Sequence, residues 1–338
     1  MTEPNKPEIN PNPRLQSYYA SLESVIGYDL LLGGTRHFGY YDNPKAYNPF
    51  PIAGSLRRME EQLFRTLRVA GGSGALVLDA GCGNGHVARY MARKGLQVTA
   101  IDVVERHVRK ARKTTRKLEK KTTAGGVGSL EVRHMDYHHL DGLDAESFDG
   151  VYTMETLVHA TDPEMVLRGF FRVLKPGGRI AMHEYDNVLE QGEGREDQTP
   201  ETEGSAATPE GKSKAGSKAE KKGKGSPGEN LKRSMRQVNE WSAMPTNAIS
   251  SPGAFKRMLE EAGFVDVEVR DLSDHIRPMT RFFYVLAIVP FWIISLLHLE
   301  RYFINTVAGV GAYRGYGFWR YVQIEARKPG EGALVEHK

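Results

Sequence analysis

The residues best suited to chemistry in this 338-residue chain lie around a glycine-rich turn. The stretch Ala75–Ala92 (ALVLDAGCGNGHVARYMA) predicts a buried strand, a tight turn and an amphipathic helix. Glycines let such a turn bend sharply and approach a ligand without a clash from Cβ, and here they are Gly81, Gly83 and Gly85. The helix presents free N–H groups at its start. The stretch therefore predicts a ligand-binding turn, of a kind that dinucleotide enzymes also use.

Carboxylates end the first three strands that the sequence predicts around this turn. Asp79 stands just before the glycines, where it can accept hydrogen bonds from the turn or from an ammonium group. Asp102 is placed to bind the vicinal hydroxyls of a ribose, and Asp136 to accept from an adenine amino group. Counted from Gly83, the sixth position is Ala88, which the dinucleotide fingerprint permits, so the glycine spacing alone leaves NAD open.

Short apolar segments, most of them separated by amphipathic segments of helix length, must position these residues. The expected strands are Ala75–Asp79, Gln97–Asp102, Leu130–Asp136, Phe148–Met154, Arg179–Glu184, Val265–Leu272 and Phe318–Ala326. Ahead of them, helices are expected over 14–33 and over 55–68, the second capped by Ser55. This alternation predicts the α/β class, with a doubly wound, mostly parallel sheet and helices on both faces.

The turn DAGCGNG (Asp79–Gly85), with the aspartates that end the second and third strands, resembles the class I S-adenosylmethionine-dependent methyltransferases. In that family these positions hold the methionine moiety, the ribose and the adenine, respectively. The resemblance covers residues 55–329 and implies S-adenosylmethionine as the cofactor and a seven-stranded sheet with an antiparallel last strand. The cofactor-binding residues that it implies are Asp79, Gly81, Gly83, Gly85, Asp102 and Asp136.

Two further segments narrow this resemblance. Ser147–Tyr185, with its ETLVHA stretch around Glu155 and His159 and its LKPGG turn, is similar to the sterol 24-C-methyltransferase group and its small-molecule relatives. HFGYY (His37–Tyr41) is similar to the aromatic N-terminal segment of that group and of tocopherol methyltransferases. The resemblance implies methyl transfer to a hydrophobic small molecule, sterol- or terpenoid-like, with C-methylation as one form.

Glu155 and His159 are the catalytic candidates, because they follow the fourth strand at the edge where open α/β sheets bind ligands. Either could accept the proton lost on methylation, and a carboxylate could also stabilise a cationic intermediate of C-methylation. The alternative for both is a surface ion pair or a cap for the helix near Asp162. Tyr40 and Tyr41 are either core aromatics or a wall over the sulfonium, which would bind their rings by cation–π attraction.

The other histidines, acids and the cysteine near the strand ends give weaker signals. The histidines around Asp136 are His134, His138 and His139. Because zinc needs several convergent ligands and this group straddles a strand end, no metal site is expected. The single cysteine, Cys82, excludes an internal disulfide framework and fits a reducing compartment. His183 and Glu184 end the fifth strand and could face the substrate, but the expectation is that they lie at the surface.

The chain is predicted to be one enlarged domain rather than two. Its parts are an N-terminal tail with a helical, aromatic cap segment (1–54), a methyltransferase domain (55–189 and 237–329), a charged insertion (190–236) and an apolar cap within the domain (276–308). The insertion has no aromatic residue and changes from acidic to basic along its length, so we predict that it is disordered. It would be either a solvated loop or a mobile electrostatic lid or tether for a partner.

The 18 residues Phe282–Leu299 carry no formal charge and would extend about 27 Å as a helix, the lower limit for crossing a membrane. The strands expected on either side should pair in one sheet, and a single crossing would separate them. An interfacial or re-entrant helix, an apolar wall of the substrate site and a core helix remain open. The basic helix Glu105–Lys121 is either a solvated face or a contact with an anionic membrane.

The charge and composition of the chain limit its possible binding partners and its possible location in the cell. The formal charge is only +4, no apolar signal stands at the N-terminus, and no aromatic residues interleave the basic helix as nucleic-acid binding would need. We expect an intracellular enzyme with a hydrophobic small-molecule substrate, either free in the cytoplasm or peripheral on an internal membrane such as the endoplasmic reticulum. The alternatives are N-, O- or S-methylation of another metabolite, a non-catalytic binding protein of this fold, and an NAD-dependent oxidoreductase.

Overall fold

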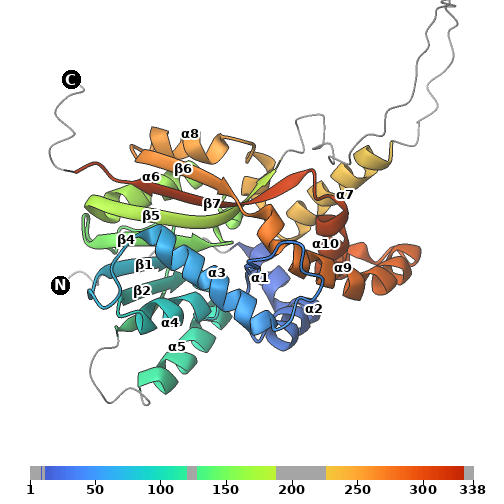
Figure 1. Ribbon diagram of the computed structural model, residues 1–338, viewed down its shortest axis with the longest axis horizontal. Coiled ribbons are helices and arrows are strands. Elements are labelled where there is room, and N and C mark those ends of the chain that lie inside the picture. The colour runs from blue at the N-terminus through green and yellow to red at the C-terminus, as the bar shows by residue number, and fades with distance from the viewer. Residues whose placement is uncertain (1–8, 10–11, 120–127, 188–225, 331–338) are drawn as a thin grey trace, which may run out of the picture.

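The computed structural model describes residues 9, 12–119, 128–187 and 226–330, and a seven-stranded sheet forms its centre (Figure 1). The strands are β1 (Leu76–Ala80), β2 (Gln97–Asp102), β3 (Leu130–His134), β4 (Phe148–Met154), β5 (Leu174–Asn187), β6 (Val265–Asp271) and β7 (Trp319–Arg327). Their order is β3-β2-β1-β4-β5-β7-β6, and neighbours are parallel except at β7, which runs antiparallel to β5 and β6. The predicted doubly wound sheet with an antiparallel last strand is confirmed.

Helices cover both faces of the sheet. They are α1 (Pro13–Ala20), α2 (Leu22–Val25), α3 (Ile52–Leu67), α4 (His86–Arg93), α5 (Glu105–Glu119), α6 (Pro163–Val173), α7 (Pro227–Trp241), α8 (Ala254–Glu261), α9 (Ser273–Leu296) and α10 (Ile304–Arg314), with the short turns η1 (Ile26–Leu31), η2 (Leu157–His159), η3 (Pro245–Ala248) and η4 (Glu300–Tyr302). Alternate strand residues face opposite layers: Val77 packs with α3 and α4, whereas Leu78 packs with α6 and α8. Both layers exclude water, which explains the nearly continuous apolar runs of the central strands.

The N-terminal helices differ from the prediction. The expected helix over 14–33 is broken at Ser21, whose hydroxyl accepts the N–H of Ser24 at 3.2 Å and so begins α2. Helix α3 begins at Ile52 rather than after Ser55. Ser55 lies inside this helix, fully buried, and its hydroxyl donates to the carbonyl of Ile52 at 2.8 Å, so it is not a cap.

The predicted insertion is also corrected at its end. Helix α7 begins at Pro227, so residues 227–236, which we expected to be disordered, are helical. Ser226 accounts for the start, because its hydroxyl accepts the N–H of Glu229 at 3.3 Å. Residues 190–225 of the expected insertion lie outside the described residues.

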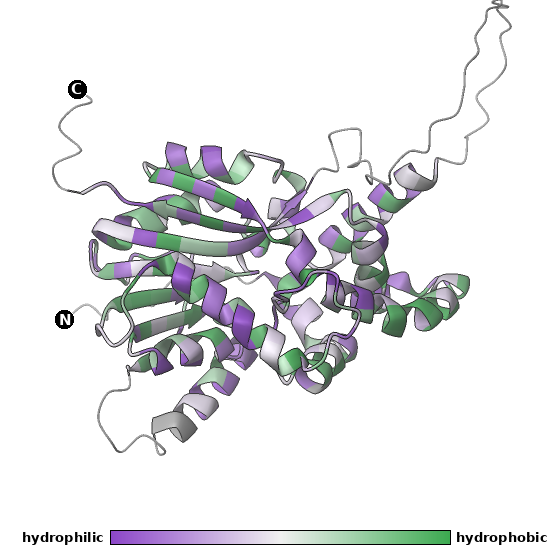
Figure 2. Cartoon of the chain, viewed as in Figure 1, coloured by the Kyte–Doolittle hydropathy of each residue, from purple (hydrophilic) through white to green (hydrophobic). Residues whose placement is uncertain are grey.

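The chain between β6 and β7 forms a helical hairpin in the place of the expected apolar cap. Helices α9 and α10 pack against each other, α7 packs on α10, and α9 continues through Pro290. Figure 1 shows the hairpin beside the end of the sheet, projecting away from it. The hydropathy colouring of Figure 2 shows that the projecting part of α9 is largely apolar.

Candidate functional site

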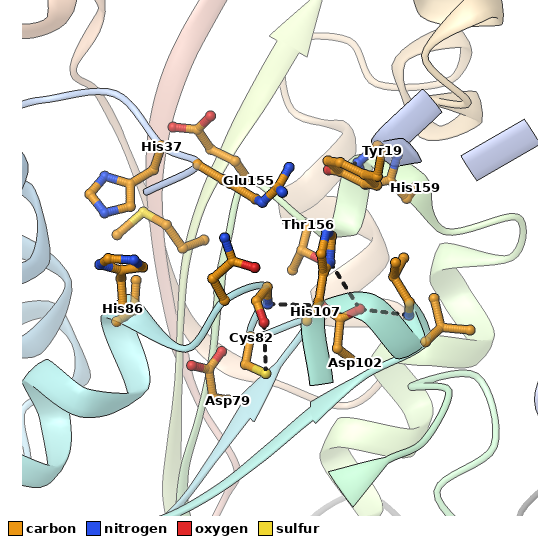
Figure 3. A pocket seen from close by; sticks show the side chains of 18 of the residues that line it. Tyr19, His37, Asp79, Cys82, His86, Asp102, His107, Glu155, Thr156 and His159 are labelled. Carbon is orange, nitrogen blue, oxygen red and sulfur yellow. Dashed lines mark hydrogen bonds and ion pairs between the residues drawn. The ribbon is translucent and has the colours of Figure 1, made fainter. Parts of the chain in front are cut away.

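The carboxyl ends of β1, β2 and β4 meet the turn after β3 at one pocket, which we call the cofactor pocket. Tyr19 and Leu15 of α1 line it from outside the sheet, together with the segment 34–37. Figure 3 shows acids and histidines from these elements facing one another across it. The topology therefore brings together residues far apart in the sequence, as expected at the switch point of a doubly wound sheet.

Asp79 is the buried carboxylate at the end of β1. Only 2% of it is exposed, and its Oδ2 has no hydrogen-bond partner among the described residues. Burial raises the pKa of Asp79 to about 8 against the lowering effect of the nearby Tyr152 hydroxyl, and the negative charge of Asp102 adds to the rise. An unpartnered acceptor in this position fits the ammonium group of the methionine moiety that the sequence predicts.

Asp102 ends β2 and organises the turn after β1. Its Oδ2 accepts the N–H of Gly83 at 2.8 Å, and its Oδ1 accepts the N–H of Val104 at 2.7 Å. Burial opposes its charge, but the imidazole of His107 and these two N–H groups outweigh burial and lower the pKa of Asp102. A carboxylate that stays charged in a pocket is suited to accept from ribose hydroxyls.

Asp136, in the turn after β3, also lines the cofactor pocket. It is buried, and its Oδ1 accepts the backbone N–H of His138 at 2.9 Å and lies 2.7 Å from the Nδ1 of that histidine. The histidine therefore orients this carboxylate. In the part of the chain that the structure describes, no group of three or more His, Cys, Asp or Glu residues is placed to hold a metal ion.

Two of the predicted cofactor residues lie outside the pocket lining. Gly85 has φ +74° and begins α4, where a Cβ would lie 3.1 Å from that of Ala111, so its role is in packing the helix. Of the two interpretations of Tyr41, the structure favours the core aromatic over the wall above the sulfonium. Tyr41 is a core aromatic that packs with Leu32, Leu56 and Met279, and its hydroxyl donates to the carbonyl of Pro49 at 2.8 Å. Gly81 and Gly83 line the pocket as predicted.

Glu155 lies where the cofactor pocket meets a second cavity, but three donors already occupy its carboxylate. Oε1 accepts the N–H of Phe38 at 2.7 Å and the hydroxyl of Tyr321 at 2.8 Å, and Oε2 accepts the hydroxyl of Tyr185. Burial raises the pKa of Glu155, against the opposing effects of the nearby His37 and of these donors. Its backbone is in the left-handed region (φ 55°).

His159 lines the cofactor pocket with both ring nitrogens engaged. Nδ1 lies 2.7 Å from the carbonyl of Ala243, which can only accept, so Nδ1 carries the proton and Nε2 accepts the hydroxyl of Tyr19 at 2.9 Å. Burial lowers the pKa of His159 to about 4, which keeps the ring neutral. The structure thus brings both catalytic candidates to the site, and each is held by protein partners.

The expected surface position of His183 and Glu184 is wrong, since both are fully buried. Glu184 Oε1 accepts from the hydroxyl of Thr153 at 2.7 Å and from the N–H of Leu157 at 3.0 Å, so it holds the turn that carries Glu155. Burial raises the pKa of Glu184 to about 7. Their burial could have been predicted from the sequence, because His183 and Glu184 continue an apolar strand and helices cover both faces of the sheet.

Arg36 was missed by the sequence analysis, although it lines both the cofactor pocket and the second cavity. Its guanidinium carbon lies 4.7 Å from the ring centres of Tyr19 and Tyr28, and its Cδ would lie 3.5 Å from a Cβ on Gly83. Its Nε and Nη1 are buried without a hydrogen-bond partner among the described residues. A fixed guanidinium with free donors beside the glycine turn fits the carboxylate of the methionine moiety.

A larger cavity of about 890 Å³, which we call the apolar cavity, adjoins the cofactor pocket at Arg36, His37 and Glu155. Its walls come from η1, α7, α9 and α10 and are mostly apolar. The volume is in the range of sites that hold small organic ligands. The two spaces together can place an apolar molecule next to a polar cofactor.

The raised pKa of Asp79 predicts a pH-dependent affinity for S-adenosylmethionine. Without the cofactor the carboxyl is mostly protonated at pH 7, whereas an adjacent ammonium group favours the carboxylate, so binding should release a proton. The affinity should therefore rise between pH 6 and pH 7.5, by up to about tenfold per unit. Calorimetry in buffers of different ionisation enthalpy measures this release. A pH-independent affinity, or one that Asp79→Asn leaves equally pH-dependent, would contradict the assignment.

Arg36→Met should weaken the affinity for S-adenosylmethionine about tenfold to a hundredfold, because a charge-assisted hydrogen bond to the carboxylate is lost. Decarboxylated S-adenosylmethionine provides the matched control. The native protein should bind it more weakly by a similar factor, and Arg36→Met should bind both ligands almost equally. If the native protein and Arg36→Met prefer S-adenosylmethionine over its decarboxylated form by the same factor, the carboxylate does not bind to Arg36.

Several known proteins are similar to this chain in sequence. A family model described as a methyltransferase domain matches residues 78–182. An S-adenosyl-L-methionine-dependent Diels-Alderase of Talaromyces variabilis is 40% identical over 315 residues, which cover 93% of this chain and 94% of the relative. A second S-adenosyl-L-methionine-dependent Diels-Alderase, of Neonectria sp. (strain DH2), is 40% identical over 263 residues, or 78% of this chain and 86% of the relative.

Less similar proteins include a further curated enzyme and two solved structures with the same fold. An O-methyltransferase of Pyrenophora dematioidea is 28% identical over 74% of this chain and 75% of its own. The crystal structure of the cyclase SpnF superposes with a TM-score of 0.63 at 22% identity and covers 96% of this chain and 100% of SpnF. A geranyl diphosphate C-methyltransferase from Streptomyces coelicolor A3(2) gives 0.62 at 16% identity, covering 96% and 100%. The chain belongs to the class I S-adenosylmethionine-dependent methyltransferase family and is an enzyme that uses S-adenosylmethionine as its cofactor.

Proposed function

We propose that this enzyme catalyses an intramolecular Diels–Alder cycloaddition of an extended, largely apolar small molecule, with S-adenosylmethionine bound but not consumed. The observation that carries the proposal is the apolar cavity, which adjoins the cofactor pocket at Arg36 and Glu155. The two relatives with 40% identity are both named S-adenosyl-L-methionine-dependent Diels-Alderases, which supports the same reaction here.

The hydrogen bonds that already hold the two candidate bases, Glu155 and His159, also favour a cycloaddition. That reaction makes two carbon–carbon bonds at the expense of π bonds and moves no proton, so it needs positioning rather than a base. Both ring nitrogens of His159 and both carboxylate oxygens of Glu155 already have protein partners. When bound, S-adenosylmethionine would supply a positive charge. Arg36 lines both spaces, and its positive charge would add to the polarisation of a substrate carbonyl.

The second candidate is methyl transfer to a hydrophobic molecule in the same cavity, sterol- or terpenoid-like, including C-methylation. The similarity to an O-methyltransferase supports it. In this case Glu155 or His159 would have to exchange a protein partner for the substrate. Activity that survives Glu155→Gln but falls with His159→Ala would favour N-, O- or S-methylation over C-methylation that depends on a stabilised cation.

Cells that lack this chain test the proposal, because the unconverted substrate should accumulate. We expect the accumulated compound to have the same mass as the product of normal cells and two rings fewer, because two carbon–carbon bonds formed within one molecule close two rings. A compound lighter than the product by one CH₂ group would instead identify methyl transfer and overturn the proposal. Complementation with the native sequence controls for unrelated changes.

A further inference from the structure

One side of α9 is an exposed apolar stripe. Its members in the helix are Val285, Leu286, Val289, Trp292, Ile293 and Leu296, and Leu297 follows directly after the helix; these residues are between 45% and 80% exposed. They recur every three or four residues and so share one side of the helix. The end of the hairpin that projects from the molecule is largely apolar in the colouring of Figure 2. A continuous group of exposed apolar side chains usually marks a binding surface, so the stripe indicates a contact with an apolar partner or an apolar phase.

The topology determines what kind of contact is possible. Helix α9 is long and apolar enough to cross a membrane, with 17% of its most apolar window buried. However, β6 precedes α9 and β7 follows α10, and these strands pair antiparallel from Val265–Arg327 to Asp271–Val322, with one register shift between Val265 and Glu268. A crossing by α9 alone would separate them. The stripe can therefore lie along an apolar surface but cannot span one.

The stripe and the apolar cavity share a boundary. Leu286, Val289 and Ile293 belong to the stripe and also line the cavity. Tyr302 and Phe303, in and after η4, line the cavity and are 61% and 38% exposed. The cavity therefore opens where the exposed apolar side chains gather, so a molecule leaving an apolar phase could enter without crossing water.

The charges around the stripe are mainly basic. Residues 277–314 contain four arginines, Arg277, Arg281, Arg301 and Arg314, and one acid, Glu300. The guanidinium of Arg314 lies 5.9 Å from the ring centre of Trp292, and that of Arg301 lies 5.1 Å from the ring of Tyr302. Basic and aromatic residues at the border of an apolar face are typical of helices that lie in the headgroup region of anionic membranes.

We propose that the α9 stripe binds to the surface of an anionic lipid bilayer, with the mouth of the apolar cavity facing the lipid. A second copy of the chain would also cover an apolar face, but it would not use the surplus of arginines, which would repel their counterparts across a symmetric interface. The entry of substrate from the lipid rests on the function proposed above. Membrane binding does not, because it is measured without substrate.

Flotation of the full chain with vesicles tests the proposal. The native protein should float with vesicles of phosphatidylcholine and phosphatidylserine, and less with phosphatidylcholine alone. The double variant Trp292→Ser/Leu296→Ser, which changes two stripe residues outside the cavity lining, should partition at least about tenfold less. The matched control is Ile249→Ser, which removes an apolar side chain that is 56% exposed elsewhere and should leave flotation unchanged.

Quenching by brominated acyl chains locates the contact. The fluorescence of Trp292 should be quenched in such vesicles, and Trp292→Phe should abolish the quenching, because Trp319 is buried and Trp241 is not in the stripe. Failure of the native protein to float, or quenching that persists in Trp292→Phe, overturns the proposal. A native dimer that the double variant converts to a monomer, without flotation of either, would assign the stripe to a second copy and also overturn it.

Discussion

Asp102→Asn will weaken the affinity for S-adenosylmethionine at least about a hundredfold. The carboxylate of Asp102 accepts N–H groups from Gly83 and Val104 and would also accept from the ribose hydroxyls. An asparagine in its place has no charge and turns an amide donor toward one of these N–H groups. Titration calorimetry measures the loss, and thermal unfolding shows whether the variant remains folded.

Tyr41→Phe is the matched control for this prediction, because a cation–π contact of Tyr41 with the sulfonium was one of the two interpretations that the sequence left open. In the structure its hydroxyl donates only to the carbonyl of Pro49, within a core cluster. We therefore expect its affinity for S-adenosylmethionine to stay within about twofold of the native value. An unchanged affinity in a folded Asp102→Asn variant would show that the cofactor lies elsewhere.

Ala308→Trp will lower turnover of the apolar substrate at least about a hundredfold and leave cofactor affinity unchanged. Ala308 lies in α10 and lines the apolar cavity but not the cofactor pocket. An indole there occupies part of the space that the substrate needs, and small errors in positioning cost large factors in rate. The compound that accumulates in cells without the chain is the assay substrate.

Ala308→Ser controls for the change at this position, because it keeps the size of the side chain. It should retain most of the activity. If Ala308→Trp binds the cofactor normally and also turns over normally, the reaction does not take place in the apolar cavity, and the proposed substrate class would have to be abandoned.

The cofactor side of the site could be predicted from the sequence because its residues lie at strand ends. Parallel strands bring their carboxyl ends to one edge, so Asp79, Asp102 and Asp136 needed only correct strand assignments to be placed together. Gly85 and Tyr41 show the limit of this reasoning. Both lie in segments that resemble a known family, yet their side-chain surroundings depend on packing with α5 and α9, far away in the sequence.

The substrate side could be predicted only in part. The segment Phe282–Leu299 was one candidate for an apolar wall, and residues of α9 do line the apolar cavity, but the remaining walls come from segments with no regular spacing. Arg36 precedes the first strand by 40 residues and approaches Gly83 only because the chain after η1 folds back over the sheet edge. Glu155 and His159 were found from their place after β4, but the sequence gives no sign of the partners that hold them. Tyr185 and Tyr321 come from β5 and β7, which pair across more than a hundred residues.

The most direct test of the central claim follows the methyl group of S-adenosylmethionine. Purified enzyme would be incubated with the accumulated compound and S-adenosylmethionine labelled with carbon-13 in its methyl group, and the product analysed by mass spectrometry. The account predicts an unlabelled product isomeric with the substrate, formed only when the cofactor is present, with the S-adenosylmethionine recovered intact. A labelled product, formed with one S-adenosylhomocysteine per turnover, would contradict it.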